Sequence, residues 1–157
     1  MLLRVPDETK AVSRSLVSDH YNRIEMSTTQ TELWKNATFS IERIEGRAPR
    51  TLIYRVTGQF NARDMYGSMK QIALGNIFEF KPAAGEETPT LHIFDLAAVP
   101  QMDSSALGTL VSHFINCRNK GIRVVVTSPS PNVQQLFKFT KVDSLIPTAA
   151  TVEEAIS

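Results

Sequence analysis

Hydrophobic and polar residues alternate in two neighbouring stretches of the chain, and this alternation predicts two half-buried strands. Phe39 and Ile41 alternate with polar residues, and the same period of two recurs from Leu52 to Thr57. The residues between the two stretches, 46–50, include glycine and proline and are typical of a turn. We therefore expect these strands to form an antiparallel hairpin.

Apolar residues recur at helical spacing in three later stretches. Asn61 is a suitable N-cap for the first of them, which runs from Ala62 to Ala73. The second begins close to residue 103 and ends at Gly121, a residue suited to stop a helix. The third begins at Ser130, which a proline follows at the first helical position. Thr151, with a glutamate three residues later, predicts a fourth, short helix.

Two apolar runs predict buried strands between these helices. Leu91–Leu96 and Ile122–Val126 are almost continuously apolar, as expected for strands that are covered on both faces. Leu145 and Ile146 favour one more short strand, and the segment 79–90 favours a solvated loop. The order β-β-α-β-α-β-α-β-α predicts the α/β class, with one mixed sheet of four to five strands packed with helices.

The first thirty residues differ in character from the rest. Val12, Leu16 and Ile24 form a ragged apolar stripe after a possible helix start at Pro6, and Ser27–Gln30 has the composition of a linker. We expect an N-terminal extension over 1–30, either helical or flexible, and a single domain over 31–157. Two interpretations stay open: a helix used for dimerisation or docking, or a loosely held tail, including a gene start placed too early with Met26 as the initiator.

Composition narrows the class of protein. The chain has 157 residues, 21% of them charged, and a net charge of +1, so its charge favours neither nucleic acid nor an anionic membrane as a partner. There is one cysteine, which excludes an internal disulfide and favours a reducing compartment. With no apolar stretch of transmembrane length and no secretory signal pattern, we expect a cytoplasmic protein.

The segment Met102–Gly108 contains the most informative chemistry. Ser104 and Ser105 lie where a buried strand passes into a helix, directly after Asp103, a suitable N-cap. A helix N-terminus has free N–H groups and favours negative charge, so a phosphate added to either hydroxyl would be stabilised locally. The same phosphate would change the surface offered to a partner. The position therefore predicts a switch.

Several separated motifs in this order resemble the STAS domain, above all the small stand-alone bacterial anti-sigma factor antagonists. The resemblance extends over about 39–156. It rests on Gly58 and the helix expected after it, Asp95, the loop to Met102, Asp103-Ser104-Ser105, Leu107-Gly108, Gly121, Val124–Val126, Val133, Leu136, Phe137 and Glu153-Glu154-Ala155.

The resemblance implies a non-enzymatic regulator of transcription that works by partner switching. An anti-sigma factor with serine kinase activity would phosphorylate Ser105, with Ser104 as the alternate, and a metal-dependent protein phosphatase would remove the phosphate. The unmodified protein would bind the anti-sigma factor and so free the sigma factor. The residues expected in the switch region and the partner-binding surface are Asp95, Val99, Met102, Asp103, Ser104, Ser105, Ala106 and Leu107.

The sequence departs from the family pattern in several places. Ala106 stands where many relatives have glycine, which alters how closely a kinase approaches the serine. The loop 79–90 is longer than usual, the last helix is short, and the N-terminal extension lies outside the pattern. These departures support an alternative function: a STAS scaffold or accessory subunit for assembly or transport regulation, without phosphorylation. A homodimer is an open alternative in either case.

Other chemistry is less favoured. Asp95 is expected to bind loop amides rather than a metal, and the histidines lack the spacing of a catalytic nucleophile and base. Cys117 shares the inward stripe of its helix, which indicates core packing. No catalytic residue, metal or cofactor is expected. Val99, Pro100 and Met102 are expected to be exposed and to form a docking surface. Four arginines surround the first hairpin, which is typical of a solvated sheet edge: Arg43, Arg47, Arg50 and Arg55.

Overall fold

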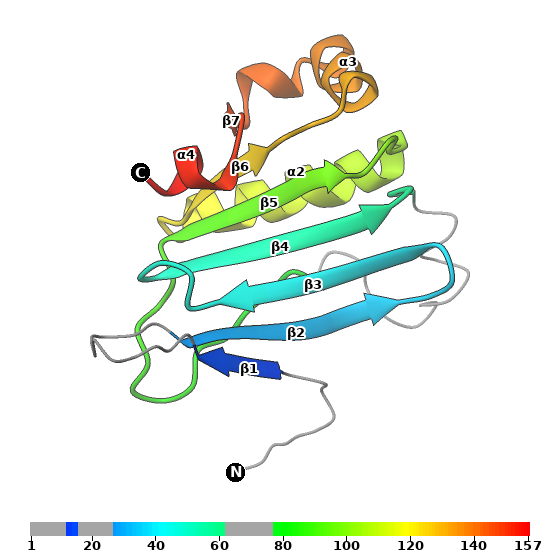
Figure 1. Ribbon diagram of the computed structural model, residues 1–157. Helices are drawn as coiled ribbons and strands as arrows, with labels where there is room; N and C mark the ends of the chain where they lie inside the picture. The colour runs from blue at the N-terminus through cyan, green and yellow to red at the C-terminus, as the bar shows by residue number, and fades with distance from the viewer. Residues whose placement is uncertain (1–11, 16–26, 62–76) are drawn as a thin grey trace.

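One seven-stranded sheet organises the chain, in a computed structural model that describes residues 12–15, 27–61 and 77–157. Its strands lie side by side in the order of the sequence (Figure 1). The strands are β1 (Val12–Ser15), β2 (Ser27–Lys35), β3 (Phe39–Glu45), β4 (Thr51–Gly58), β5 (Leu91–Ala98), β6 (Arg123–Thr127) and β7 (Thr148–Ala149). The helices are α2 (Ser104–Asn119), α3 (Pro131–Thr140), a 3₁₀ turn η2 (Val142–Ser144) and α4 (Val152–Ile156).

The sheet is mixed, and its two halves differ in strand direction. β1 to β4 pair as an antiparallel meander, whereas β4 to β7 pair in parallel. Parallel neighbours need crossover connections, and α2 and α3 supply them between β5, β6 and β7. The carboxyl ends of β5 and β6 therefore lie at one edge of the sheet, followed by the starts of α2 and α3 (Figure 1).

The expected hairpin is confirmed, with β3 and β4 paired from Phe39 opposite Gly58 to Glu45 opposite Leu52. Gly58 has a φ of +100°, a backbone conformation that is strained for any residue with a side chain. A Cβ built there would lie 2.1 Å from the carbonyl oxygen of Thr38. Only glycine therefore fits at this end of β4.

The helix boundaries follow the sequence signals closely. Gly121, at a φ of +76°, follows the end of α2, and its N–H donates to the carbonyl of Arg118. Ser130 caps α3, and Thr151 accepts a hydrogen bond from the N–H of Glu154 at the start of α4. The helix expected after Asn61 lies outside the described residues. None of the helices in the described ranges is long and apolar enough to cross a membrane.

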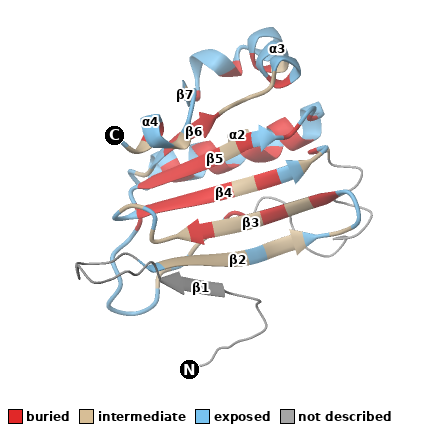
Figure 2. Cartoon of the chain, in the orientation of Figure 1, coloured by how far each residue is buried: buried red, intermediate tan, exposed pale blue. Residues whose placement is uncertain are grey.

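Apolar side chains cover both faces of the central strands. The larger cluster joins β3, β4 and β5 to buried residues of α2 and α3, and it includes Tyr54, Phe94 and Leu110. The smaller cluster lies on the opposite face, where Ile53 and Ile93 pack with α4. Burial is densest in β4, β5 and β6 and falls off toward β2 (Figure 2). The expected strands are confirmed as β5 and β6, and β6 is buried from Val124 onward.

The sheet has more strands than the four to five expected, because two polar strands extend its antiparallel side. Ser27–Gln30 is not a linker but the first half of β2, whose threonines favour strands although no apolar alternation marks them. The helical interpretation is wrong for Val12–Ser15, which forms β1. The rest of the extension, 1–11 and 16–26, lies outside the described residues. The short strand near the C-terminus is Thr148–Ala149 rather than Leu145-Ile146, because the N–H groups of Leu145 and Ile146 both donate to the carbonyl of Val142 within a turn.

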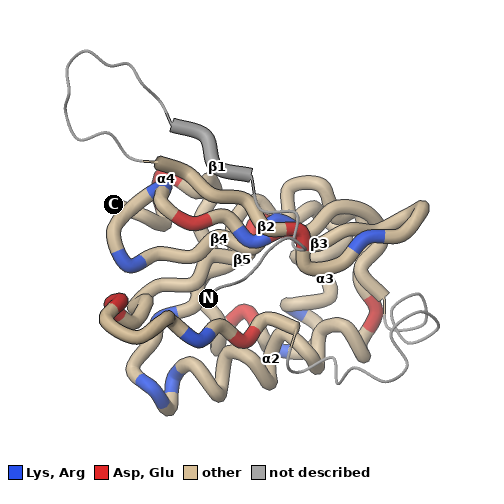
Figure 3. Tube along the Cα trace, turned by 90° about the horizontal axis from the view of Figure 1, so that it is seen from below, with Lys and Arg blue, Asp and Glu red and all other residues tan. Residues whose placement is uncertain are grey.

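The arginines around the hairpin are paired with acids and do not protect an edge, since β2 and β5 flank the hairpin on either side. Basic and acidic positions are accordingly interspersed along the described chain (Figure 3). The four pairs are Arg43 with Glu45 at 3.2 Å, Arg50 with Glu87 at 3.7 Å, Arg55 with Asp95 at 3.7 Å, and Arg47 with Glu153.

Replacing Gly58 with alanine should destabilise the fold by more than about 2 kcal/mol. The new Cβ would overlap the carbonyl oxygen of Thr38, and a φ of +100° is strained for alanine. Gly108→Ala is the matched control. That glycine lies within α2, and an added Cβ would meet no atom within 4 Å beyond its chain neighbours and the backbone of its own helix, so alanine should stabilise the helix by about 0.5–1 kcal/mol. Urea unfolding of both variants measures the difference, and equal stability of the two would contradict the packing at Gly58.

Candidate functional site

The loop between β5 and α2 is held by two backbone hydrogen bonds to Phe60, which follows the end of β4. The N–H of Phe60 donates to the carbonyl of Gln101 at 3.0 Å, and the N–H of Asp103 donates to the carbonyl of Phe60 at 3.2 Å. Phe60 and Met102 thereby form a parallel bridge. Because Phe60 is fully buried, this bridge fixes the loop to the core.

Asp103 caps α2 and sets the position of the two serines. Its carboxylate accepts a hydrogen bond from the N–H of Ala106 at 2.8 Å. The backbone of Asp103 is extended, with a φ of −95° and a ψ of 174°, as is usual for an N-cap residue. The expected N-cap role of Asp103 is thus confirmed. Ser104 and Ser105 are the first two residues of the helix, and both are exposed. The first turn of α2 therefore presents two hydroxyl-bearing residues to solvent beside a carboxylate.

The expected exposure of the apolar loop residues is largely wrong. Val99 is 1% exposed and Met102 is 9% exposed, and both belong to the larger core cluster. Ala106 and Leu107 are also buried. The side chain of Ala106 packs in the core, so it does not cover the serines. Of the loop's apolar residues, Pro100 is exposed as expected.

Asp95 has the structural role that the sequence suggested. Its carboxylate accepts a hydrogen bond from the N–H of Ala97 at 3.0 Å and lies 3.7 Å from the guanidinium of Arg55. The side chain therefore orders the first residues after the buried part of β5, upstream of the serines.

The start of α3 adjoins the same loop. The hydroxyl of Ser130, which caps α3, donates a hydrogen bond to the carbonyl of Pro100 at 3.1 Å. The amide of Asn132 lies 3.5 Å from the same carbonyl. Two helix N-termini thus share one surface, and the positive ends of their dipoles make this edge of the sheet favourable for negative charge.

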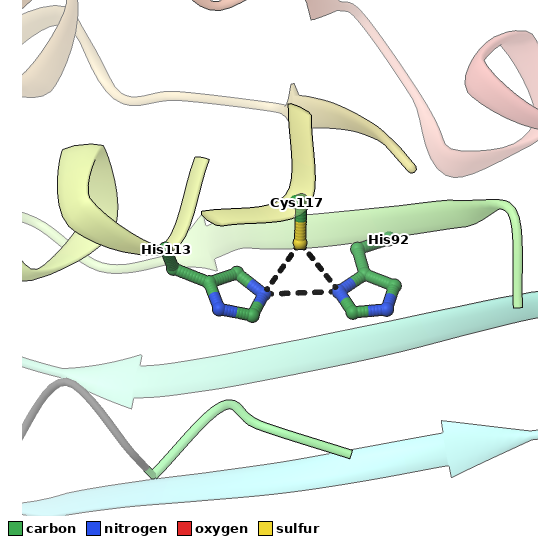
Figure 4. A group of neighbouring side chains, drawn as sticks. All are labelled: His92, His113 and Cys117. Atoms are coloured by element: carbon green, nitrogen blue, oxygen red, sulfur yellow. Dashed lines mark hydrogen bonds between the residues drawn. The ribbon is translucent and has the colours of Figure 1, made fainter. Parts of the chain in front are cut away.

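The far end of α2 holds a second cluster, formed by His92, His113 and Cys117, whose polar atoms face one another (Figure 4). The Nδ1 of His92 lies 2.9 Å from the Nε2 of His113. The Sγ of Cys117 lies 3.5 Å from the first nitrogen and 3.3 Å from the second. All three residues are buried.

Burial determines the protonation of this cluster. It lowers the pKa of His92 to about 3, with a smaller effect of the neighbouring His113, and it lowers the pKa of His113 to about 4. Burial also raises the pKa of the Cys117 thiol to about 11. Both imidazoles are therefore neutral at pH 7, and the thiol keeps its proton.

No sequence pattern predicted that these three residues lie together. The histidines were not expected to be catalytic, and Cys117 was expected to pack in the core. The available signal was the spacing of four between His113 and Cys117, which puts both on one helix face. That face packs against the sheet that contains His92, but the pairing of α2 with β5 at this point is a tertiary contact that no local pattern reveals.

A model of the STAS domain matches residues 43–155, well over half of the chain. The chain belongs to the STAS domain family. The match includes β4, the loop with its bridge to Phe60, both serines and α3, so the site just described lies within the family's shared region.

Solved structures share the fold of this STAS protein. A sulfate transporter family protein from Wolinella succinogenes matches with a TM-score of 0.55 at 17% identity, over 69% of this chain and 84% of that chain. The anti-sigma factor antagonist SpoIIAA in its unphosphorylated form matches with a TM-score of 0.53 at 22% identity, over 75% of this chain and 92% of that chain. An anti-sigma factor antagonist from Mycobacterium paratuberculosis matches with a TM-score of 0.53 at 18% identity, over 75% of this chain and 91% of that chain. At these identities the similarity establishes the fold alone.

Replacing Asp103 with alanine should lower the free energy of unfolding by about 1 kcal/mol, because the N–H of Ala106 loses its acceptor. Asp103→Asn keeps an acceptor oxygen and is the matched control, with little expected change. Urea unfolding measures both. An equal loss in the two variants would show that the negative charge, rather than the capping hydrogen bond, stabilises α2.

Proposed function

We propose that this STAS protein is a cytoplasmic anti-sigma factor antagonist that works by partner switching, with Ser105 as the phosphoacceptor and Ser104 as the alternate. The observation that carries the proposal is the exposure of both serines in the first turn of α2, on a loop bridged to the core. The STAS family membership and the fold shared with anti-sigma factor antagonists support it.

The proposed chemistry belongs to the partners. An anti-sigma factor with kinase activity transfers the γ-phosphoryl group of ATP to the serine oxygen, so that ADP leaves and the hydroxyl proton passes to a base of the kinase. A metal-dependent phosphatase hydrolyses the phosphoserine and restores the hydroxyl. The STAS domain supplies the acceptor and the docking surface, and no catalytic role is proposed for its own residues.

The electrostatics of the first turn explain how one phosphate can act as a switch. The group adds between one and two negative charges at neutral pH. The N-terminus of α2 stabilises such charge within the protein, so the fold is retained. A partner docked over the loop, however, would clash with the added phosphate and would have to remove water from it. Acidic groups of the partner would also be repelled by the phosphate and by the neighbouring carboxylate of Asp103. A loss of roughly 3 kcal/mol in that interface weakens binding about a hundredfold.

The docking surface is proposed to consist of exposed residues only. It includes the two serines, Pro100 and the start of α3, which the hydrogen bond from Ser130 to Pro100 holds beside the loop. Val99, Met102, Ala106 and Leu107 support this surface from the core rather than contact the partner.

Ser105→Asp should weaken binding to the kinase-like anti-sigma factor encoded in the same genome by at least tenfold, because a fixed charge then occupies the docking surface. Ser112→Asp is the matched control. It makes the same change at an exposed position two turns further along α2 and should bind as the wild type does. Titration calorimetry measures both. Wild-type affinity of Ser105→Asp and Ser104→Asp alike would contradict the switch and favour the scaffold alternative.

Incubation of the protein with that kinase and ATP should add a single phosphate, which peptide mass spectrometry should locate on Ser105. Ser105→Ala should abolish the modification or move it to Ser104, and the double alanine variant should take up none. Phosphate at any residue outside the first turn of α2 would count against the proposed acceptor.

A further inference from the structure

His92, His113 and Cys117 have no role in the proposed switch, yet they form the densest group of metal-binding atoms in the described part of the chain. One histidine comes from β5, and the other two residues come from successive turns of α2 (Figure 4). Their nearest nitrogen and sulfur atoms all lie within 4.8 Å of one another. Imidazole nitrogen and thiolate sulfur are the donors that zinc and related divalent transition metals prefer.

The dimensions of the donor triangle fit a tetrahedral ion. With Zn–N of about 2.05 Å and Zn–S of about 2.3 Å, tetrahedral angles separate two nitrogens by roughly 3.3 Å and a nitrogen from sulfur by roughly 3.6 Å. The observed separations are 2.9 Å between the nitrogens and 3.5 and 3.3 Å from sulfur to each nitrogen. The triangle therefore needs to open by only a few tenths of an ångström around an ion.

Hydrogen bonding among the three groups is an incomplete explanation of this arrangement. A neutral imidazole has one protonated nitrogen and one nitrogen with a single lone pair, and a thiol has one weak donor. Three polar atoms in mutual contact cannot all make well-directed hydrogen bonds with so few protons. An ion near the centre would satisfy the lone pairs of both histidines and of the thiolate at once.

A cavity gives an ion a route to the cluster. Its volume is about 250 Å³, and all three residues line it together with Glu79, Lys81 and Lys120. Structural zinc sites use four protein ligands, whereas three protein ligands leave one position for water or another small ligand. Glu79 favours the cation itself, and the two lysines favour an anionic group such as hydroxide in that position.

We propose that His92, His113 and Cys117 bind one divalent ion of the zinc class, with the fourth coordination position facing this cavity. The Nδ1 of His92, the Nε2 of His113 and the thiolate of Cys117 are the protein ligands, and the thiol proton passes to solvent when the ion binds. The site is separate from the serines, so it can be tested whether or not phosphorylation occurs.

The experiment uses the full-length protein, free of affinity tags and kept reduced, with Co²⁺ as a spectroscopic probe and Zn²⁺ as a competitor. We expect one Co²⁺ per chain, visible bands of a four-coordinate ion and a near-ultraviolet thiolate charge-transfer band. Since the chain has one cysteine, that band can arise only from Cys117. Zn²⁺ should abolish the bands and raise the midpoint of thermal unfolding.

Cys117→Ala should abolish the charge-transfer band, and His113→Gln should weaken metal binding by at least about tenfold. Asn119→Gln changes an exposed residue of the same helix and should leave the charge-transfer band and the metal affinity unchanged. Should the buried variants fail to fold, the wild-type spectrum decides alone. No thiolate band under stoichiometric Co²⁺, or metal binding unaffected by Cys117→Ala, would overturn the proposal.

Discussion

The burial of the central strands on both faces is the constraint on which the rest of the structure depends. β4, β5 and β6 are too apolar to leave either face to water, so α2 and α3 cover one face and α4 covers part of the other. Because these strands are parallel, each connection must cross back over the sheet. The same constraint therefore places the starts of α2 and α3 together at one edge, where the serines lie.

Local signals predicted much of this arrangement. The hairpin, the apolar strands, and the caps at Asp103, Ser130 and Thr151 could be read from short patterns, because a cap or an alternation is set by neighbouring residues. β2 was missed because its strand character rests on pairing with β3 rather than on apolar alternation. The exposure of Val99 and Met102 was misjudged for a similar reason, since the bridge to Phe60 that turns the loop inward joins residues far apart in the sequence.

Helix α2 carries two kinds of chemistry on different faces. Its first turn presents exposed serines, and its inward face, about 12 Å further along the axis at His113, carries two members of the buried cluster. The outward residues can change without disturbing packing, whereas the inward ones contact aromatic rings, including Tyr54 and Phe94. The helix thus separates a surface function from an interior one, although a single element positions both.

The bridge between Phe60 and Met102, together with the hydrogen bond from Ser130 to Pro100, ties the loop before α2 from two sides. A loop held in this way has little conformational freedom left to lose during complex formation. A protein that recognises it would meet a preformed shape and could dock as a nearly rigid body. Selectivity among competing regulators would then depend on the fit and charge of the contact surface, with little contribution from the folding of a flexible segment.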